Sequence, residues 1–162
     1  MSYDSTREAY DLRKTSNGVS TILLNNLKFS NHLKLQMEVM GGNNSNTQPR
    51  LGLFNGNTGI TSRVIWNSND NYFGISQQGK SDDGTNIQLD SSISLALDTW
   101  YTVELEFDNG TVTAKLMQGD TVISSLSGTE TTLSSNNNDF ALLVGFNTSS
   151  RMYVKNIQIQ EL

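Results

Sequence analysis

Cysteine is absent from this 162-residue chain, and proline and histidine each occur once. Without cysteine, the protein has no disulfide framework, no thiolate nucleophile and no cysteine-ligated metal site. The single histidine, His32, cannot form a multi-histidine metal site, and we interpret it as a surface residue rather than a catalytic one. A chain of this length can bury a core large enough to fold without covalent cross-links.

Basic clusters and long apolar runs are also lacking. The net charge is −5, and the lysines and arginines are scattered along the chain. These features argue against a nucleic-acid partner, which needs a concentrated basic surface. No apolar run approaches the ~18 residues of a membrane-spanning helix, and the first residues lack the apolar segment of a signal peptide. We therefore expect no membrane insertion.

The clearest positive pattern occupies residues 98–117. Apolar side chains stand at every second position from Val103 to Phe107 and again from Val112 to Leu116, with Asn109-Gly110 between the two runs. Period-two alternation gives a strand one apolar and one polar face, and Asn-Gly tolerates the positive φ angles of a tight turn. The stretch predicts a β-hairpin that lays one face on a core.

The rest of the chain repeats this pattern in short segments separated by residues that favour turns. No window has the spacing of an amphipathic helix, so we predict an all-β fold: an antiparallel two-sheet β-sandwich of ten to thirteen strands. We interpret residues 1–18 as a linker or boundary segment that could add an edge strand, and we predict that residues 19–162 form a single domain. The further strands are predicted at 19–24, 33–39, 50–54, 60–66, 71–77, 121–126, 140–146 and 152–162, the last with a bulge at Lys155-Asn156 and the run 140–146 as an interior strand.

Three stretches of the sequence carry a resemblance to a known superfamily. They are DTWYTVELEFDNG from Asp98, FALLVGFN from Phe140, and the terminal YVKNIQIQEL. Together they resemble the concanavalin A-like lectin and glucanase superfamily, including its laminin G-like and carbohydrate-binding-module members. The resemblance covers about residues 19–162. It implies a jelly-roll sandwich with one concave sheet, on which many relatives bind glycans, and it implies that Trp100 packs in the core or caps a sheet edge.

A sugar site needs aromatic faces for the apolar side of a pyranose, together with side chains that hydrogen-bond its hydroxyls. Tyr72 alternates with the apolar Phe73 and Ile75 and is expected to face outward, with Trp66 beside it across the turn at 67–70. Both aromatics could instead cap the core. The candidate carbohydrate-binding residues are Trp66, Tyr72, Arg63, Asn71, Gln77 and Arg50.

An alternative is a glycoside hydrolase or lyase that uses Glu104 and Glu106. Retaining hydrolysis needs two carboxyl groups about 5–5.5 Å apart, and residues two apart on one strand approach that separation. The superfamily's acidic signature, Glu-x-Asp-x-x-Glu, is incomplete here because Asp108 is followed at once by the Asn-Gly turn. We interpret the pair as a solvated face that is paired across the strands with Lys115, and we predict no enzymatic activity.

Acidic residues in the loops suggest one candidate cofactor, Ca²⁺, which prefers oxygen ligands. Their spacing matches no dedicated calcium loop, so they also read as turn formers. The residues are Asp70, Asp82, Asp83 and Asp90.

From these observations we predict a non-catalytic carbohydrate-binding or adhesion module with a glycan or polysaccharide partner. It would belong to a larger secreted, cell-surface or viral tail protein and would act extracellularly or on a virion, for example in host recognition. A structural or protein-interaction spacer domain remains an alternative.

Overall fold

The computed structural model describes residues 1–13, 20–27, 32–43, 46–67, 70–79, 84–130, 133, 138–144 and 150–162. None of these segments is a helix long and apolar enough to cross a membrane. Their regular structure consists of thirteen β-strands. The strands are β1 (Ser2–Asp4), β2 (Ala9–Arg13), β3 (Ser20–Leu27), β4 (His32–Gly41), β5 (Arg50–Asn55), β6 (Thr58–Ile65), β7 (Tyr72–Gly79), β8 (Thr85–Asp90), β9 (Tyr101–Asp108), β10 (Thr111–Gln118), β11 (Thr121–Thr129), β12 (Asn138–Val144) and β13 (Arg151–Glu161).

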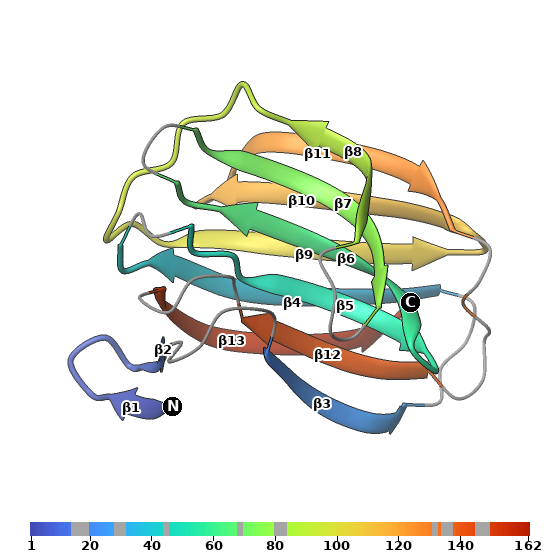
Figure 1. Cartoon of the computed structure of the whole chain (residues 1–162), viewed down its shortest axis with the longest axis horizontal. Coiled ribbons are helices and arrows are strands. Elements are labelled where there is room, and N and C mark those ends of the chain that lie inside the picture. Colours follow the sequence, from blue (N-terminus) through green and yellow to red (C-terminus); the bar gives the residue numbers. More distant parts are fainter. Residues whose placement is uncertain are drawn as a thin grey trace.

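The strands form two sheets that pack as layers (Figure 1). The seven-stranded sheet has the order β1-β2-β13-β4-β9-β10-β11, and the six-stranded sheet has the order β3-β12-β5-β6-β7-β8. Neighbouring strands are antiparallel, as in the β7 and β8 pair and in the β13 and β4 pair. The prediction of an all-β, antiparallel two-sheet sandwich is therefore confirmed.

The core lies between the layers and follows the period-two alternation of the sequence. In β4, the side chains of Leu33, Leu35, Met37 and Val39 are buried, while the residues between them are half-buried. Leu51, Leu53, Ile60, Val64, Phe73 and Ile75 supply the opposing layer. Burial of this alternating apolar face is the main force that fixes the register of each strand.

The central hairpin forms as predicted from β9 and β10. Asp108 pairs with Thr111, and the two turn residues between them have positive φ angles, 46° at Asn109 and 89° at Gly110. These are the angles that an Asn-Gly turn supplies at little steric cost.

Residues 2–13 lie at one edge of the seven-stranded sheet as β1 and β2. Residues 10–13 of β2 pair antiparallel with residues 151–154 of β13. The turn between β1 and β2 is held by Arg7, which forms ion pairs with Asp4 at 3.2 Å and with Asp98 at 3.7 Å. The Arg7 guanidinium also lies 4.6 Å from the centre of the Tyr153 ring. This segment is thus docked onto the sandwich.

The last strand contains the predicted bulge. The register of β13 against β4 shifts between Lys155 and Gln158, and Asn156 has a φ angle of 50°. A strand is also present where the run 140–146 predicts one, and β12 lies between β3 and β5 in its sheet. Residues 145–146 of that prediction lie outside the described residues.

Candidate functional site

The outer face of the six-stranded sheet, pointing away from the core, is set by the strand register. Val64 pairs with Phe73 inside the core, so their neighbours Arg63 and Gly74 point outward. The same alternation places on this face Arg50, Gly52, Phe54, Gly59, Thr61, Arg63, Ile65, Tyr72, Gly74, Ser76 and Gln78. We call this set the outer face of the six-stranded sheet.

Several polar residues of this face are buried and bonded to one another. Arg50 donates from Nη1 to Gln78 Oε1 at 2.9 Å and from Nη2 to Gln48 Oε1 at 2.7 Å. Thr61 donates from Oγ1 to Gln78 Oε1 at 2.7 Å. Arg50 and Thr61 are 0% exposed, and Gln78 is 3% exposed. The structure therefore places Arg50 beneath the surface, where it orients two amides.

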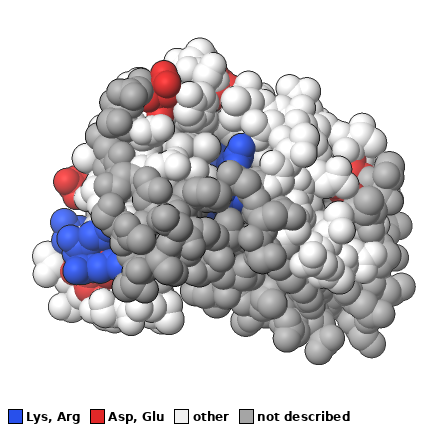
Figure 2. Space-filling view, in the orientation of Figure 1, with Lys and Arg blue, Asp and Glu red and all other residues white. Residues whose placement is uncertain are grey.

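A second cluster surrounds Arg63. Its Nη2 atom donates to Asn86 Oδ1, which also accepts a hydrogen bond of 3.0 Å from Ser76 Oγ. Gly74 is the register partner of Arg63 on the neighbouring strand. A Cβ atom added to Gly74 would lie 3.1 Å from a methyl carbon of Leu89. Figure 2 shows a small area of basic surface near the middle of the face that looks toward the viewer.

Tyr72 also faces outward, as predicted, because it pairs with Ile65 on this face. It is half-buried, and desolvation together with a hydrogen bond to Asp70 raises its pKa. Its neighbour Asn71 donates from Nδ2 to the carbonyl of Leu95 at 3.5 Å.

Trp66 does not lie beside Tyr72, and the prediction of an outward Trp66 and Tyr72 platform is wrong. Trp66 is 0% exposed and belongs to the core, where its Nε1 donates to the carbonyl of Ala96 at 3.2 Å. The physical reason is alternation: Trp66 follows Ile65 and so has the inward orientation of Val64. An indole enclosed in this way has no face left for a sugar.

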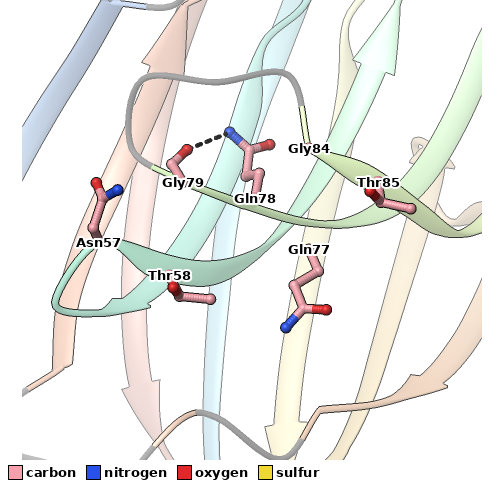
Figure 3. Close-up of a pocket in the computed structure, with 7 residues that line it drawn as sticks. All are labelled: Asn57, Thr58, Gln77, Gln78, Gly79, Gly84 and Thr85. Atoms are coloured by element: carbon pink, nitrogen blue, oxygen red, sulfur yellow. Dashed lines mark hydrogen bonds between the residues drawn. The ribbon is translucent and has the colours of Figure 1, made fainter.

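A pocket of about 310 Å³ opens where β6 begins, β7 ends and β8 begins. In Figure 3, Gln77 and Gln78 leave β7 on opposite sides, and Gln78 Nε2 donates to the carbonyl of Gly79 at 3.3 Å. Gln78 joins this pocket to the buried Arg50 network. The described residues that line the pocket are Asn57, Thr58, Gln77, Gln78, Gly79, Gly84 and Thr85.

The structure thus brings some of the candidate residues together. Arg50, Arg63 and Tyr72 share the outer face of the six-stranded sheet, and Gln77 lines the pocket at its margin. Sequence reasoning missed the other pocket residues, because they come from three strand ends that meet only through the register. The available signal was the turn from Asn55 to Gly59. It predicts a β-hairpin, but it does not predict which other strand ends lie beside that hairpin.

Glu104 and Glu106 lie on the opposite side of the molecule, on the outer face of the seven-stranded sheet. Glu104 pairs with Lys34 at 2.6 Å, and Glu106 contacts His32 Nε2 at 2.7 Å. Lys115 is the register partner of Glu104, as predicted, but the basic groups that the carboxylates contact come from β4. Both acids are therefore held in cross-strand pairs.

Two of the four candidate calcium ligands can be described. Asp90 accepts hydrogen bonds from Ser124 Oγ, at 2.6 Å, and from Ser92, and these bonds lower its pKa. Asp70 bonds to Tyr72. No group of three or more His, Asp or Glu residues suited to a metal occurs in the described part of the chain. Asp82 and Asp83 lie outside the described residues.

No protein-family model and no curated protein sequence matches this chain. Solved structures do match. The CBM2 module of the evolved Dit protein of Lactobacillus casei BL23 phage J-1 aligns with 93% of this chain and 74% of its own, at a TM-score of 0.67 and 12% identity. The Ca²⁺/Man3GlcNAc-bound VIP36 exoplasmic/lumenal domain aligns with 95% of this chain and 80% of its own, at a TM-score of 0.70 and 12% identity.

The carbohydrate recognition domain of Emp46p gives a TM-score of 0.68 at 8% identity, over 94% of this chain and 82% of its own. Identities this low establish the fold and not the ligand. The chain therefore shares the fold of these three domains.

Proposed function

We propose that this domain is a non-catalytic carbohydrate-binding module. The observation that carries the proposal is the pocket at the margin of the six-stranded sheet, on a fold shared with a carbohydrate recognition domain and with a Man3GlcNAc-bound domain. Its described lining offers three amide side chains and two hydroxyls, and none of these lining residues is charged. Amides and hydroxyls can both donate and accept, which is what the hydroxyls of a neutral sugar require.

The dimensions of the site support a small ligand portion. A volume of about 310 Å³ lies at the lower end of the range of ligand pockets, roughly 300–1,000 Å³, and suits about one sugar residue. Further residues of an oligosaccharide would lie on the outer face of the six-stranded sheet. There Tyr72 and Leu89 offer apolar surface.

The buried network beneath the pocket supports a rigid site. Gln78 has its side-chain oxygen bonded to Arg50 and Thr61 and its nitrogen bonded to Gly79. A side chain fixed at both ends loses little conformational freedom when a ligand binds. In this proposal Gln78 shapes the floor, and the exposed Gln77, Asn57 and Thr85 contact the sugar.

The non-catalytic part of the proposal rests on Glu104 and Glu106. Each carboxylate is engaged by a basic side chain of β4 on the sheet opposite the pocket. We expect Glu104→Gln to leave glycan binding unchanged, and no reducing ends to be released from a bound polysaccharide. If the protein degrades a polysaccharide and Glu104→Gln abolishes this activity, the hydrolase or lyase hypothesis is favoured instead.

The proposed setting rests on the same fold neighbours, a phage Dit module and an exoplasmic/lumenal domain. We propose an extracellular or virion location, as part of a larger secreted, cell-surface or viral tail protein. The proposed binding of the glycan does not require Ca²⁺, and this can be tested. Glycan binding measured in Ca²⁺ and in EDTA is expected to give the same affinity, and a loss of binding in EDTA would contradict this.

The central experiment is a glycan array followed by isothermal titration with the best ligand. Gln77→Ala should weaken binding about tenfold, because one hydrogen-bonded contact to the sugar is worth roughly 1.4 kcal/mol. Gln118→Ala is the matched control, since Gln118 is an exposed glutamine on β10 outside the pocket lining. If no glycan binds, the spacer alternative is favoured. If both variants lose affinity equally, the pocket is not the sugar-binding site.

A further inference from the structure

Gly84 comes directly before β8 and lines the pocket at the margin of the six-stranded sheet. It is exposed and has a φ angle of 68°. Glycine adopts such an angle freely, whereas a residue with a Cβ atom adopts it at a cost. The angle is not special to the pocket, because Gly119, which is also exposed, has a φ angle of 57° in the turn between β10 and β11.

The two glycines differ in the space that surrounds them. A Cβ atom added to Gly84 would lie 2.3 Å from Cβ of Gln78 and 2.4 Å from the carbonyl oxygen of Gln77. A Cβ atom added to Gly119 would come within 4 Å of no described atom beyond the adjoining residues. Optimal contacts between carbon atoms are about 3.5–4.0 Å long, so a side chain at 84 would force the two strands apart by roughly 1 Å or more.

The strand register brings the start of β8 close to β7. Thr85 pairs with Gln77, so the residue before it, Gly84, falls beside Gln78 (Figure 3). Across the register shift of this strand pair, β8 has one residue more than β7, namely Ile87, and a bulge of this kind bends its strand. The first residues of β8 can lie against the backbone of β7 only because residue 84 has no side chain.

The atoms that face Gly84 are held in place. Gln78 is 3% exposed, and its side-chain oxygen accepts hydrogen bonds from Arg50 at 2.9 Å and from Thr61 at 2.7 Å. The carbonyl oxygen of Gln77 belongs to the backbone of β7, which pairs with β6 on its other side. A side chain at 84 would therefore displace the first residues of β8 and leave β7 in place.

We propose that Gly84 is a positioning residue of the pocket: because it has no side chain, Thr85 is held at the distance from Gln77 that a bound sugar requires. This inference rests on the proposed function, in which Gln77 and Thr85 both contact the sugar. The polar groups of a binding site need to be held to within about 0.5 Å of the productive geometry. A displacement of β8 that exceeds this tolerance separates the two contacts, and the sugar keeps only one of them.

NMR spectra of the chain without ligand test the position of Gly84 directly. In the unmodified protein, an Hα atom of Gly84 should give a strong nuclear Overhauser effect (NOE) to Hβ of Gln78, because the two residues are in contact. In Gly84→Ala, the backbone amide signals of Gln77 and Thr85 should shift. Gly119→Ala is the matched control, since it also places a Cβ atom at a positive φ angle, and it should leave these two signals unchanged.

Isothermal titration with the glycan that gives the strongest signal on the array tests the consequence for binding. We expect Gly84→Ala to weaken the affinity about tenfold, as the loss of one hydrogen-bonded contact would, and Gly119→Ala to bind like the unmodified chain. Both variants should have a lower melting temperature, because both strain a turn. A role in the turn alone would therefore lower the melting temperature and leave the affinity unchanged.

The outcomes separate this inference from the proposed function. The inference is overturned if the NOE between Gly84 and Gln78 is missing, if both variants shift the signals of Gln77 and Thr85 equally, or if Gly84→Ala binds the glycan with unchanged affinity. If no glycan binds the unmodified chain, the proposed function fails, and the NMR spectra decide whether Gly84 positions Thr85. If Gly84→Ala does not fold, the NOE in the unmodified chain decides.

Discussion

The two outer faces of the sandwich are both polar, but their side chains interact in different ways. On the six-stranded sheet, Arg50, Thr61 and Gln78 are at most 3% exposed and bond to one another through neutral oxygens. On the seven-stranded sheet, Lys34 pairs with Glu104 while 27% and 11% of their side chains remain exposed. Hydrogen bonds in the buried network are shielded from water, whereas exposed ion pairs are weakened by solvent and salt.

This difference suits the two faces to different tasks. A face built from buried amides has fixed donors and acceptors and a neutral surface, which favours recognition of a neutral polar ligand. A face that carries ion pairs with part of their surface in water resists non-specific association. The three predictions below test how far the contrast holds.

The largest effect is expected from Arg50→Met. The variant leaves the oxygens of Gln48 and Gln78 without their guanidinium donor inside the protein. We expect the free energy of unfolding, measured in urea, to fall by roughly 2–4 kcal/mol. A loss no greater than that of a surface substitution would show that the network contributes little to stability.

An intermediate effect is expected from Asp11→Asn, on the outer face of the seven-stranded sheet. Burial alone would raise the pKa of Asp11, but hydrogen bonds from Arg13 and Arg151 and their positive charges outweigh it and lower the pKa to about 2. Because this value lies below the usual ~3.9, ionised Asp11 stabilises the folded state at neutral pH, and the contribution is lost as pH falls from about 4 to about 2.

We therefore expect Asp11→Asn to cost about 1–2 kcal/mol at neutral pH, after allowing for solvent around the exposed Arg13. The difference between the two proteins should shrink at about pH 2.5, where Asp11 begins to be protonated in the folded state. Urea unfolding at both pH values makes the comparison. A difference that stays constant with pH would mean that packing, and not charge, sets the effect.

The smallest effect is expected from Lys34→Met, the charged counterpart of Arg50→Met. Removing this partner of Glu104, whose side chain is 11% exposed, should cost about 1 kcal/mol, and the cost should fall in high salt. The measurement is urea unfolding in low and high salt. If Lys34→Met destabilised the protein as much as Arg50→Met, the contrast between the faces would be lost.

Alternation along single strands predicted much of this molecule, including the β9 and β10 hairpin, the outward Tyr72 and the bulge in β13. The prediction of an outward Trp66 was wrong because it rested on the nearness of Trp66 to Tyr72 across the turn, whereas alternation places Trp66 on the inward side with Val64. The pocket was also missed. It depends on a register shift between Ile75 and Ser76 that sets how β8 meets β7, and no local pattern predicts such a shift.

The burial of Trp66 gives the protein two tryptophans in unlike surroundings. Trp66 sits inside the core near the Tyr101 ring, whereas Trp100 is half-buried on the outer face of the seven-stranded sheet under the Lys155 ammonium. Fluorescence from the first should be blue-shifted and protected from iodide, and fluorescence from the second should be quenched more readily. Each indole can thus serve as an intrinsic optical probe, one for the space between the layers and one for the surface near β13.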